Sequence, residues 1–185
     1  MRTEATLPNL VIIYGPPFSG KTSVAQALAR SLSDKAALVS IDALLTESIL
    51  VPGRDAISEL EMVHTQARLM VANYLKNGYH VVVEGAFYYE RDGVLHRHEQ
   101  EIDQLVALMR NLARSPLVVR LSAADAVLSR RAEATARQAE VAAATRIEAE
   151  YKPRYGNRTL RIQTDELSAP EVAAQIEERL EAEFA

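Results

Sequence analysis

Short apolar runs alternate with longer segments of mixed polarity along the whole chain. Five runs rich in β-branched residues have the length and the polar stops of buried strands: 10–14, 37–41, 80–83, 117–121 and 159–163. Apolar residues that recur every three or four positions predict helices over 21–32, 56–76, 100–114 and 169–184. Strands that alternate with helices and are apolar along their length predict an α/β domain with a mostly parallel sheet.

The segment 123–150 has a biased composition. It holds 11 Ala, four Arg and no Gly or Pro, and this composition also predicts a helix. Because it has few large apolar residues it can bury little surface, so we expect part of it to be mobile. Neither a linker nor a repeat interrupts the pattern, and we therefore expect residues 1–185 to form one domain.

The composition of the 185 residues narrows the class of protein. The chain has no Cys, which excludes disulfides, thiolate metal sites and a Cys nucleophile from it. A formal charge of −4 argues against a protein whose main task is to grip duplex DNA. No apolar run approaches about 18 residues and no signal peptide is evident, so we expect no membrane partner and a cytoplasmic location.

The strongest chemical signal is Gly15-Pro16-Pro17-Phe18-Ser19-Gly20-Lys21-Thr22, which fits the phosphate-loop pattern G-x-x-x-x-G-K-[ST] between a predicted strand and a predicted helix. Proline has no N–H, so the donors to phosphate have to be the amides of 18–22 at a helix N-terminus. Lys21 would bridge the β- and γ-phosphates, and the Thr22 hydroxyl would ligate Mg²⁺. We therefore assign nucleotide binding to seven residues: Gly15, Phe18, Ser19, Gly20, Lys21, Thr22 and Ser23.

Asp42 ends the predicted second strand. The carboxyl ends of parallel strands face the ligand crevice of an α/β sheet, so Asp42 is expected across from the γ-phosphate. There its carboxylate would accept the proton of an acceptor hydroxyl or hold Mg²⁺ through water. A second interpretation is the N-cap of a helix that starts at Ala43, and the two roles are compatible.

Glu84 follows the apolar run 81–83 in the same way. An acid at this place resembles a Walker B position, where a carboxylate orients Mg²⁺ or a water, but it would also suit binding of an acceptor hydroxyl. The alternative is a structural ion pair, because a charge at the end of a buried strand needs a partner.

Arginines in the Ala-rich segment are candidates for charge stabilisation. Arg130 and Arg137 are seven positions apart and share a helix face. One arginine that reaches in would stabilise the negative charge on the transferring phosphoryl group, and we favour Arg130 or Arg131, then Arg137, over Arg146. The alternative is a solvated helix with local ion pairs such as Glu133–Arg137.

Four further candidates carry weaker signals. Arg54 would contact an acceptor or be solvated. His96 and His98 form an H-x-H pair without an evident third ligand, which favours surface histidines over a metal site. The dipeptide 164–165 would flank the adenine, or Asp165 would serve the turn before the last helix.

The order of these motifs resembles the small P-loop kinases, and within them the branch of chloramphenicol phosphotransferase, zeta-type toxins and polynucleotide 5′-hydroxyl kinases. The residues that carry the resemblance are the segments 15–22, 39–42, 81–85, 128–131 and 162–165. The resemblance implies a three-layer fold with a five-stranded, mostly parallel sheet, an Arg-bearing helical lid (about 123–156) and an aspartate base that matches Asp42. It also implies contact of Glu84 with the acceptor.

The sequence therefore predicts a kinase that moves the γ-phosphoryl group of Mg·ATP to a hydroxyl of a small polar acceptor, such as a nucleotide-sugar, nucleoside or antibiotic. Two alternatives stay open: a switch protein that binds and slowly hydrolyses ATP, and a kinase of nucleic-acid 5′ ends. The acidic charge balance disfavours a nucleic-acid partner. A GTPase is disfavoured because no N-K-x-D motif is present. The sequence leaves the oligomeric state undetermined.

Overall fold

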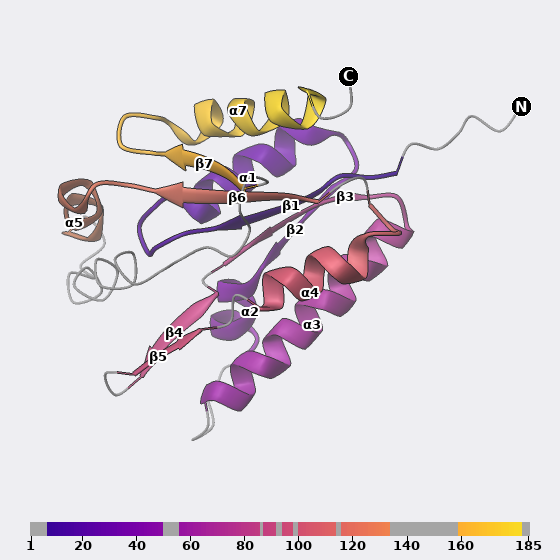
Figure 1. Cartoon of the computed structure of the whole chain (residues 1–185), viewed down its shortest axis with the longest axis horizontal. Helices are drawn as coiled ribbons and strands as arrows, with labels where there is room; N and C mark the ends of the chain where they lie inside the picture. The colour runs from indigo at the N-terminus through magenta and orange to yellow at the C-terminus, as the bar shows by residue number, and fades with distance from the viewer. Residues whose placement is uncertain are drawn as a thin grey trace, which may run out of the picture.

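A five-stranded sheet in which neighbouring strands run parallel forms the centre of the molecule (Figure 1). The computed structural model describes residues 7–49, 56–85, 87–91, 94–97, 100–113, 116–133 and 159–182. The strands lie in the order β2 (Ala36–Ser40), β3 (His80–Glu84), β1 (Leu10–Tyr14), β6 (Leu117–Ser122) and β7 (Thr159–Gln163). The predicted α/β class, the strand count and the parallel arrangement are thus confirmed.

Helices cover both faces of this sheet, which gives three layers (Figure 1). One face carries α1 (Lys21–Leu32) and α7 (Ala169–Ala182), and the other carries α3 (Ala56–Lys76) and α4 (Gln100–Met109). Successive residues of a strand point to opposite faces, so the fully apolar strand β1 supplies both cores. Its residue Ile12 packs toward α3, and Ile13 packs toward α1 and α7.

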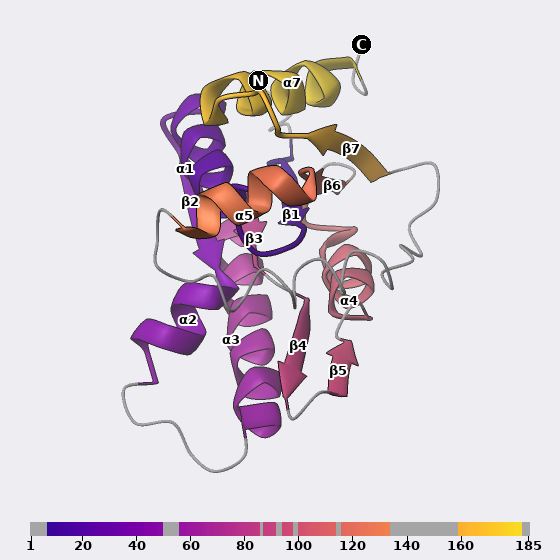
Figure 2. The ribbon, with the colours of Figure 1, turned by 90° about the vertical axis from the view of Figure 1, so that its left-hand side faces the viewer.

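The strands all end at the same edge of the sheet, and shorter elements gather there (Figure 2). Helix α2 (Ile41–Glu47) follows β2 directly, and α5 (Asp125–Glu133) follows β6. After β3 comes an antiparallel hairpin, β4 (Tyr88–Arg91) and β5 (Val94–Arg97), which is separate from the main sheet. The carboxyl edge is therefore where the chain departs most from a plain strand–helix alternation.

Most predicted boundaries hold, and the differences have local causes. Helices 21–32 and 56–76 are confirmed at both ends. The second strand ends at Ser40 and not at Ile41, because the Ser40 side chain accepts a hydrogen bond from the Ala43 amide (3.1 Å) and starts a helix at once.

The remaining differences are in helices on the carboxyl-terminal half and in the hairpin. Helix α4 stops at Met109, short of the predicted end at 114, and turns lead on toward Pro116, before which a helix is disfavoured. Helix α5 begins at Asp125, and the predicted lid from residue 134 to its end at about 156 lies outside the described residues. Hairpin β4–β5 was not predicted. In the described part of the chain, no helix combines the length and apolar character needed to cross a bilayer.

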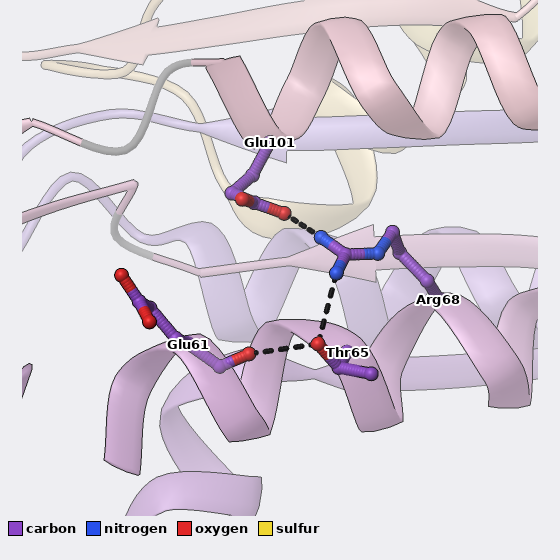
Figure 3. A network of polar contacts seen from close by, with 4 residues as sticks. All are labelled: Glu61, Thr65, Arg68 and Glu101. Atoms are coloured by element: carbon purple, nitrogen blue, oxygen red, sulfur yellow. Dashed lines mark hydrogen bonds and ion pairs between the residues drawn. The ribbon is translucent and has the colours of Figure 1, made fainter. Parts of the chain in front are cut away.

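Helices α3 and α4 are joined by an ion pair between Arg68 and Glu101 (Figure 3). Arg68 also donates to the Thr65 hydroxyl (2.9 Å), which itself donates to the Glu61 carbonyl (3.0 Å). The Glu101 side chain is only 11% exposed, so its carboxylate depends on this guanidinium for solvation. The pair therefore fixes the first turn of α4 against α3.

Replacing Arg68 by methionine is expected to destabilise the protein by about 2 kcal/mol, because it leaves a largely buried carboxylate without its charged partner. For a domain of this size the melting temperature should fall by about 4–8 °C. Calorimetry of Arg68→Met and of the double variant Arg68→Met/Glu101→Met checks this. The double variant should have a higher melting temperature than the single variant. If the single variant and the original protein had equal melting temperatures, the pair would contribute nothing to stability.

Candidate active site

The loop Gly15–Thr22, called the P-loop below, connects β1 to the first turn of α1 at the carboxyl edge. Gly20 has φ +92° and precedes the helix, a conformation that glycine adopts without strain. A Cβ atom placed on Gly20 would meet no atom within 4 Å, so the loop is open on this side of Gly20. The predicted strand, loop and helix context of a phosphate site is therefore present.

Lys21 lies in this loop with 7% of its surface exposed. Its ammonium nitrogen Nζ donates to the Pro16 carbonyl across the loop (3.1 Å). A buried ammonium group needs such polar contacts. The charge is therefore held at the P-loop itself and does not extend into solvent.

Glu84 is fully buried at the end of β3 and contacts the start of α1. Its Oε1 accepts hydrogen bonds from the Ser40 hydroxyl (2.5 Å) and the Thr22 hydroxyl (3.4 Å). Its Oε2 is buried and has no hydrogen-bond partner among the described residues. An unsatisfied buried carboxylate oxygen beside a P-loop threonine fits the oxygen ligands that Mg²⁺ prefers. Thr22 and Glu84 are thus suitable to hold Mg²⁺ directly or through water.

Burial raises the pKa of Glu84 above its ordinary value, and the nearby Asp42 carboxylate raises it further. The Ser40 and Thr22 hydrogen bonds and the charge of Lys21 oppose this effect but do not cancel it. Between the ordinary and the raised pKa, the folded protein binds more protons than the unfolded chain, so ionisation of Glu84 costs stability as the pH rises.

Glu84→Gln is therefore expected to stabilise the metal-free protein at neutral pH. As the pH rises above about 4.5, the stability of the variant should also fall less than that of the original protein. Urea unfolding with EDTA at several pH values measures both effects, and Glu178→Gln, at an exposed position of α7, is the matched control. Lower stability of Glu84→Gln at neutral pH would contradict the sign of the shift.

Asp42 occupies the first turn of α2 and not the end of a strand. The interpretation of Asp42 as the N-cap of this helix is wrong, because Ser40 is the N-cap. Asp42 nevertheless lies at the expected edge: a side chain on Gly85 would stand 2.7 Å from Ile41 Cβ and 3.5 Å from Asp42 Oδ1. The close approach of α2 to the end of β3 therefore brings the Asp42 and Glu84 carboxylates together.

Arg131 of α5 is engaged with the P-loop and with the residue after β7. Its Nη1 donates to the Phe18 carbonyl (3.1 Å) and to Thr164 Oγ1 (3.0 Å), and its Nη2 donates to the Thr164 carbonyl (2.5 Å). Asp165 Oδ1 accepts a hydrogen bond from the Ala124 amide just before α5 (2.7 Å). Asp165 thus links the segment after β7 to the start of α5, while Thr164 contacts the P-loop.

Of the two arginine candidates that the structure describes, Arg131 contacts the P-loop and Arg130 does not. Arg130 is exposed on α5, next to Arg131. Three candidates lie outside the described residues: Arg54, Arg137 and Arg146. His98 does as well, and His96 lies in β5 opposite Tyr89. Among the described residues, no group of three or more His, Asp or Glu side chains is arranged to hold a metal.

Two cavities flank the first turn of α1. One, of about 310 Å³, lies between α1, Arg131 and the segment after β7. Its lining is Ser19, Gly20, Ser23, Val24, Arg131, Thr164, Leu167, Ala169 and Val172. The other, of about 400 Å³, lies on the β2 side of the same turn. Its lining is Thr22, Gln26, Leu38, Val39, Ser40, Ala43, Leu44, Glu47, Ser48 and Met70.

Sequence reasoning gave no site role to Ser40, which caps α2 and binds Glu84. The signal was present, because a serine between a strand and an acidic first helical turn is a preferred N-cap. The hydrogen bond from Arg131 to the Phe18 carbonyl had no sequence signal, since the two residues are 113 positions apart.

Comparison with known proteins agrees with this geometry. The sequence matches the AAA_33 family model, described as an AAA domain, over residues 10–153. No curated protein matched the chain.

Several solved structures share the fold. A putative kinase from Chloroflexus aurantiacus J-10-fl superposes with a TM-score of 0.68 at 21% identity, over 96% of this chain and 98% of that one. The shikimate kinase of Acinetobacter baumannii gives 0.67 at 15% identity, over 97% and 96%. The Mycobacterium tuberculosis APS kinase CysC gives 0.68 at 16% identity, over 95% and 99%. Because the family match spans well over half of the sequence, this chain belongs to the AAA_33 family, and its fold is that of the P-loop kinases.

Proposed function

We propose that this protein transfers the γ-phosphoryl group of Mg·ATP to a hydroxyl group of a small polar acceptor. The observation that carries the proposal is the convergence of the P-loop, Asp42 and Glu84 at one edge of the sheet. Thr22 and Ser40 both donate to Glu84, and Asp42 lies beside it. A phosphate loop, an oxygen-rich metal site and a further carboxylate are the parts that phosphoryl transfer to a hydroxyl requires.

The cavity beside Arg131 suits the nucleoside of ATP. Four aliphatic side chains line it, those of Val24, Leu167, Ala169 and Val172, and it borders the P-loop at Gly20. Apolar walls next to a helix N-terminus would hold a planar base while the phosphates reach the P-loop amides. This supports the expectation that Thr164 flanks the adenine.

The cavity on the β2 side suits the acceptor. It reaches Thr22 and Ser40 at the metal-binding end, and its polar lining further includes Gln26, Glu47 and Ser48. Hydroxyl, amide and carboxylate groups dominate the polar part of the described lining, and groups of this kind favour a hydroxyl-bearing acceptor. Solved structures that share the fold include a gluconokinase from Sinorhizobium meliloti 1021 and the shikimate kinase named above, whose names specify small-molecule acceptors.

In this proposal each group has one task. The P-loop amides and Lys21 bind the phosphates, and Asp42 orients and deprotonates the acceptor hydroxyl. Mg²⁺ held at Thr22 and Glu84 would neutralise charge on the phosphate oxygens. The sequence favours Arg130, Arg131 or Arg137 for further positive charge at the transition state. Because Arg131 is bonded to the Phe18 carbonyl, we assign this task to Arg130 or Arg137.

The test is transfer of labelled γ-phosphate from ATP to a panel of acceptors. The panel holds nucleosides, UDP-sugars, hydroxyl-bearing antibiotics, gluconate, shikimate and a 5′-hydroxyl oligonucleotide, with Lys21→Met as the blank. A labelled product absent from the blank supports the kinase and names the acceptor class. An antibiotic, UDP-sugar or oligonucleotide product would support the chloramphenicol phosphotransferase, zeta-type or polynucleotide-kinase branch. Label found only as free phosphate across the panel would favour the ATP-hydrolysing switch.

A further inference from the structure

The P-loop is held from its outer side by Arg131 and Thr164, which we call the outer clamp. Arg131 donates to the Phe18 carbonyl (3.1 Å), and the Thr164 hydroxyl donates to the Ser19 carbonyl (3.0 Å). We propose that the outer clamp orients the phosphate-binding amides of the P-loop, so that Arg131 and Thr164 are positioning residues for the triphosphate.

The planarity of the peptide bond supplies the mechanism. In a trans peptide the carbonyl and the following N–H point in opposite directions. With the Phe18 carbonyl turned out to Arg131, the Ser19 amide faces into the loop, where it donates a hydrogen bond to the Pro16 carbonyl (3.3 Å) that a phosphate oxygen would have to replace. With the Ser19 carbonyl turned out to Thr164, the Gly20 amide points away from the clamp. The hydrogen bonds accepted by the Phe18 and Ser19 carbonyls thus set the directions of the two amides that follow them, those of Ser19 and Gly20.

The backbone at this point needs such support. Phe18 has φ +66°, a left-handed conformation that is costly for a residue with a large side chain. Conformations of this kind persist where the surroundings over-determine them. Rotation of the Phe18–Ser19 peptide would turn a carbonyl toward the phosphates, and the hydrogen bond from Arg131 opposes that rotation.

The outer clamp is itself fixed by contacts with the sheet and within the clamp. Thr164 is 3% exposed, and its amide donates to the Ser122 carbonyl at the end of β6 (2.8 Å). Its Oγ1 and carbonyl oxygen both accept from the Arg131 guanidinium. The Thr164 hydroxyl therefore donates while it accepts. Its one proton is shared between the Ser19 carbonyl (3.0 Å) and the Ser122 carbonyl (3.2 Å), which fixes its direction between the P-loop and β6.

This inference rests on the proposed function only in assigning the P-loop to phosphate. The test compares Thr164→Val, which removes the hydroxyl at nearly constant shape, with Thr164→Ser, which retains it. The probes are Mg·tripolyphosphate, which has no base, and Mg·ATP, with dissociation constants measured by calorimetry. Because Thr164 also borders the base cavity, tripolyphosphate separates the effect on the amides from any effect on the nucleoside.

We expect Thr164→Val to weaken both probes by a similar factor of about 10, the value of one hydrogen bond, and Thr164→Ser to stay within about 2-fold of the original protein. Arg131→Lys, which loses the forked geometry, should also weaken tripolyphosphate. Unchanged tripolyphosphate affinity in Thr164→Val with weaker ATP binding would overturn the proposal, since Thr164 would then act on the base alone. Failure of the original protein to bind tripolyphosphate would overturn both the proposal and the phosphate assignment. Tripolyphosphate binding with no acceptor phosphorylated would overturn the kinase alone.

Discussion

Replacement of Lys21 by methionine is expected to reduce phosphoryl transfer by roughly 10³- to 10⁵-fold, as found for the loss of a cation that contacts the transferring phosphoryl group. Lys21 is 7% exposed and its ammonium group already lies at the P-loop, bonded to the Pro16 carbonyl. Methionine keeps the length and the apolar stem, so the change removes the charge with little effect on packing. Removal of a buried cation near Glu84 should therefore act on the chemistry more than on the fold.

The measurement is single-turnover transfer with the acceptor that the panel identifies, beside the melting temperature of each variant. Lys35→Met is the matched control, because Lys35 lies at the other end of the sheet, exposed and bonded to the Asn77 carbonyl (2.5 Å). The control should keep full activity. A Lys21→Met protein that folds normally and retains more than about a tenth of the activity would remove Lys21 from the mechanism.

The sheet and the P-loop were predictable because their signals are local. Strands β1, β2 and β3 are mainly apolar runs that a polar residue or glycine ends, whereas β6 and β7 each contain an arginine. Helix 56–76 carries its apolar stripe from end to end. The phosphate-loop pattern is contiguous, so its identification needs no tertiary information. The edge that carries Asp42 and Glu84 followed from the parallel arrangement alone.

The parts that could not be predicted depend on contacts between distant segments. The bond from Ser40 to Glu84 requires β2 and β3 to be neighbours in the sheet, an order that the sequence does not state. The guanidinium of Arg131 differs from that of Arg130 only in the direction in which the helix presents it. The hairpin β4–β5 had a turn signal at Asp92-Gly93, but its strands lack a clear apolar alternation.

Asp42→Asn is the second variant for which we expect a large effect. If Asp42 accepts the proton of the acceptor hydroxyl, turnover falls by about 10²- to 10⁴-fold, which is less than for Lys21→Met because the transfer depends mainly on positioning and charge neutralisation. Asparagine is isosteric and can still bind a hydroxyl group, but it cannot accept its proton at neutral pH. The KM for ATP should therefore change little while kcat falls.

The position of Asp42 beside Glu84 also suits a carboxylate that holds Mg²⁺ through water, and the Mg²⁺ dependence separates the two roles. For a base, saturating Mg²⁺ leaves the turnover of Asp42→Asn at its reduced value. For a metal-holding residue, the Mg²⁺ concentration at half-maximal rate rises and excess Mg²⁺ restores turnover. Asp34→Asn, at an exposed position just before β2, is the matched control for loss of one carboxylate. Full turnover of Asp42→Asn at ordinary Mg²⁺ would exclude both roles and leave positioning by the P-loop and the lid as the source of catalysis.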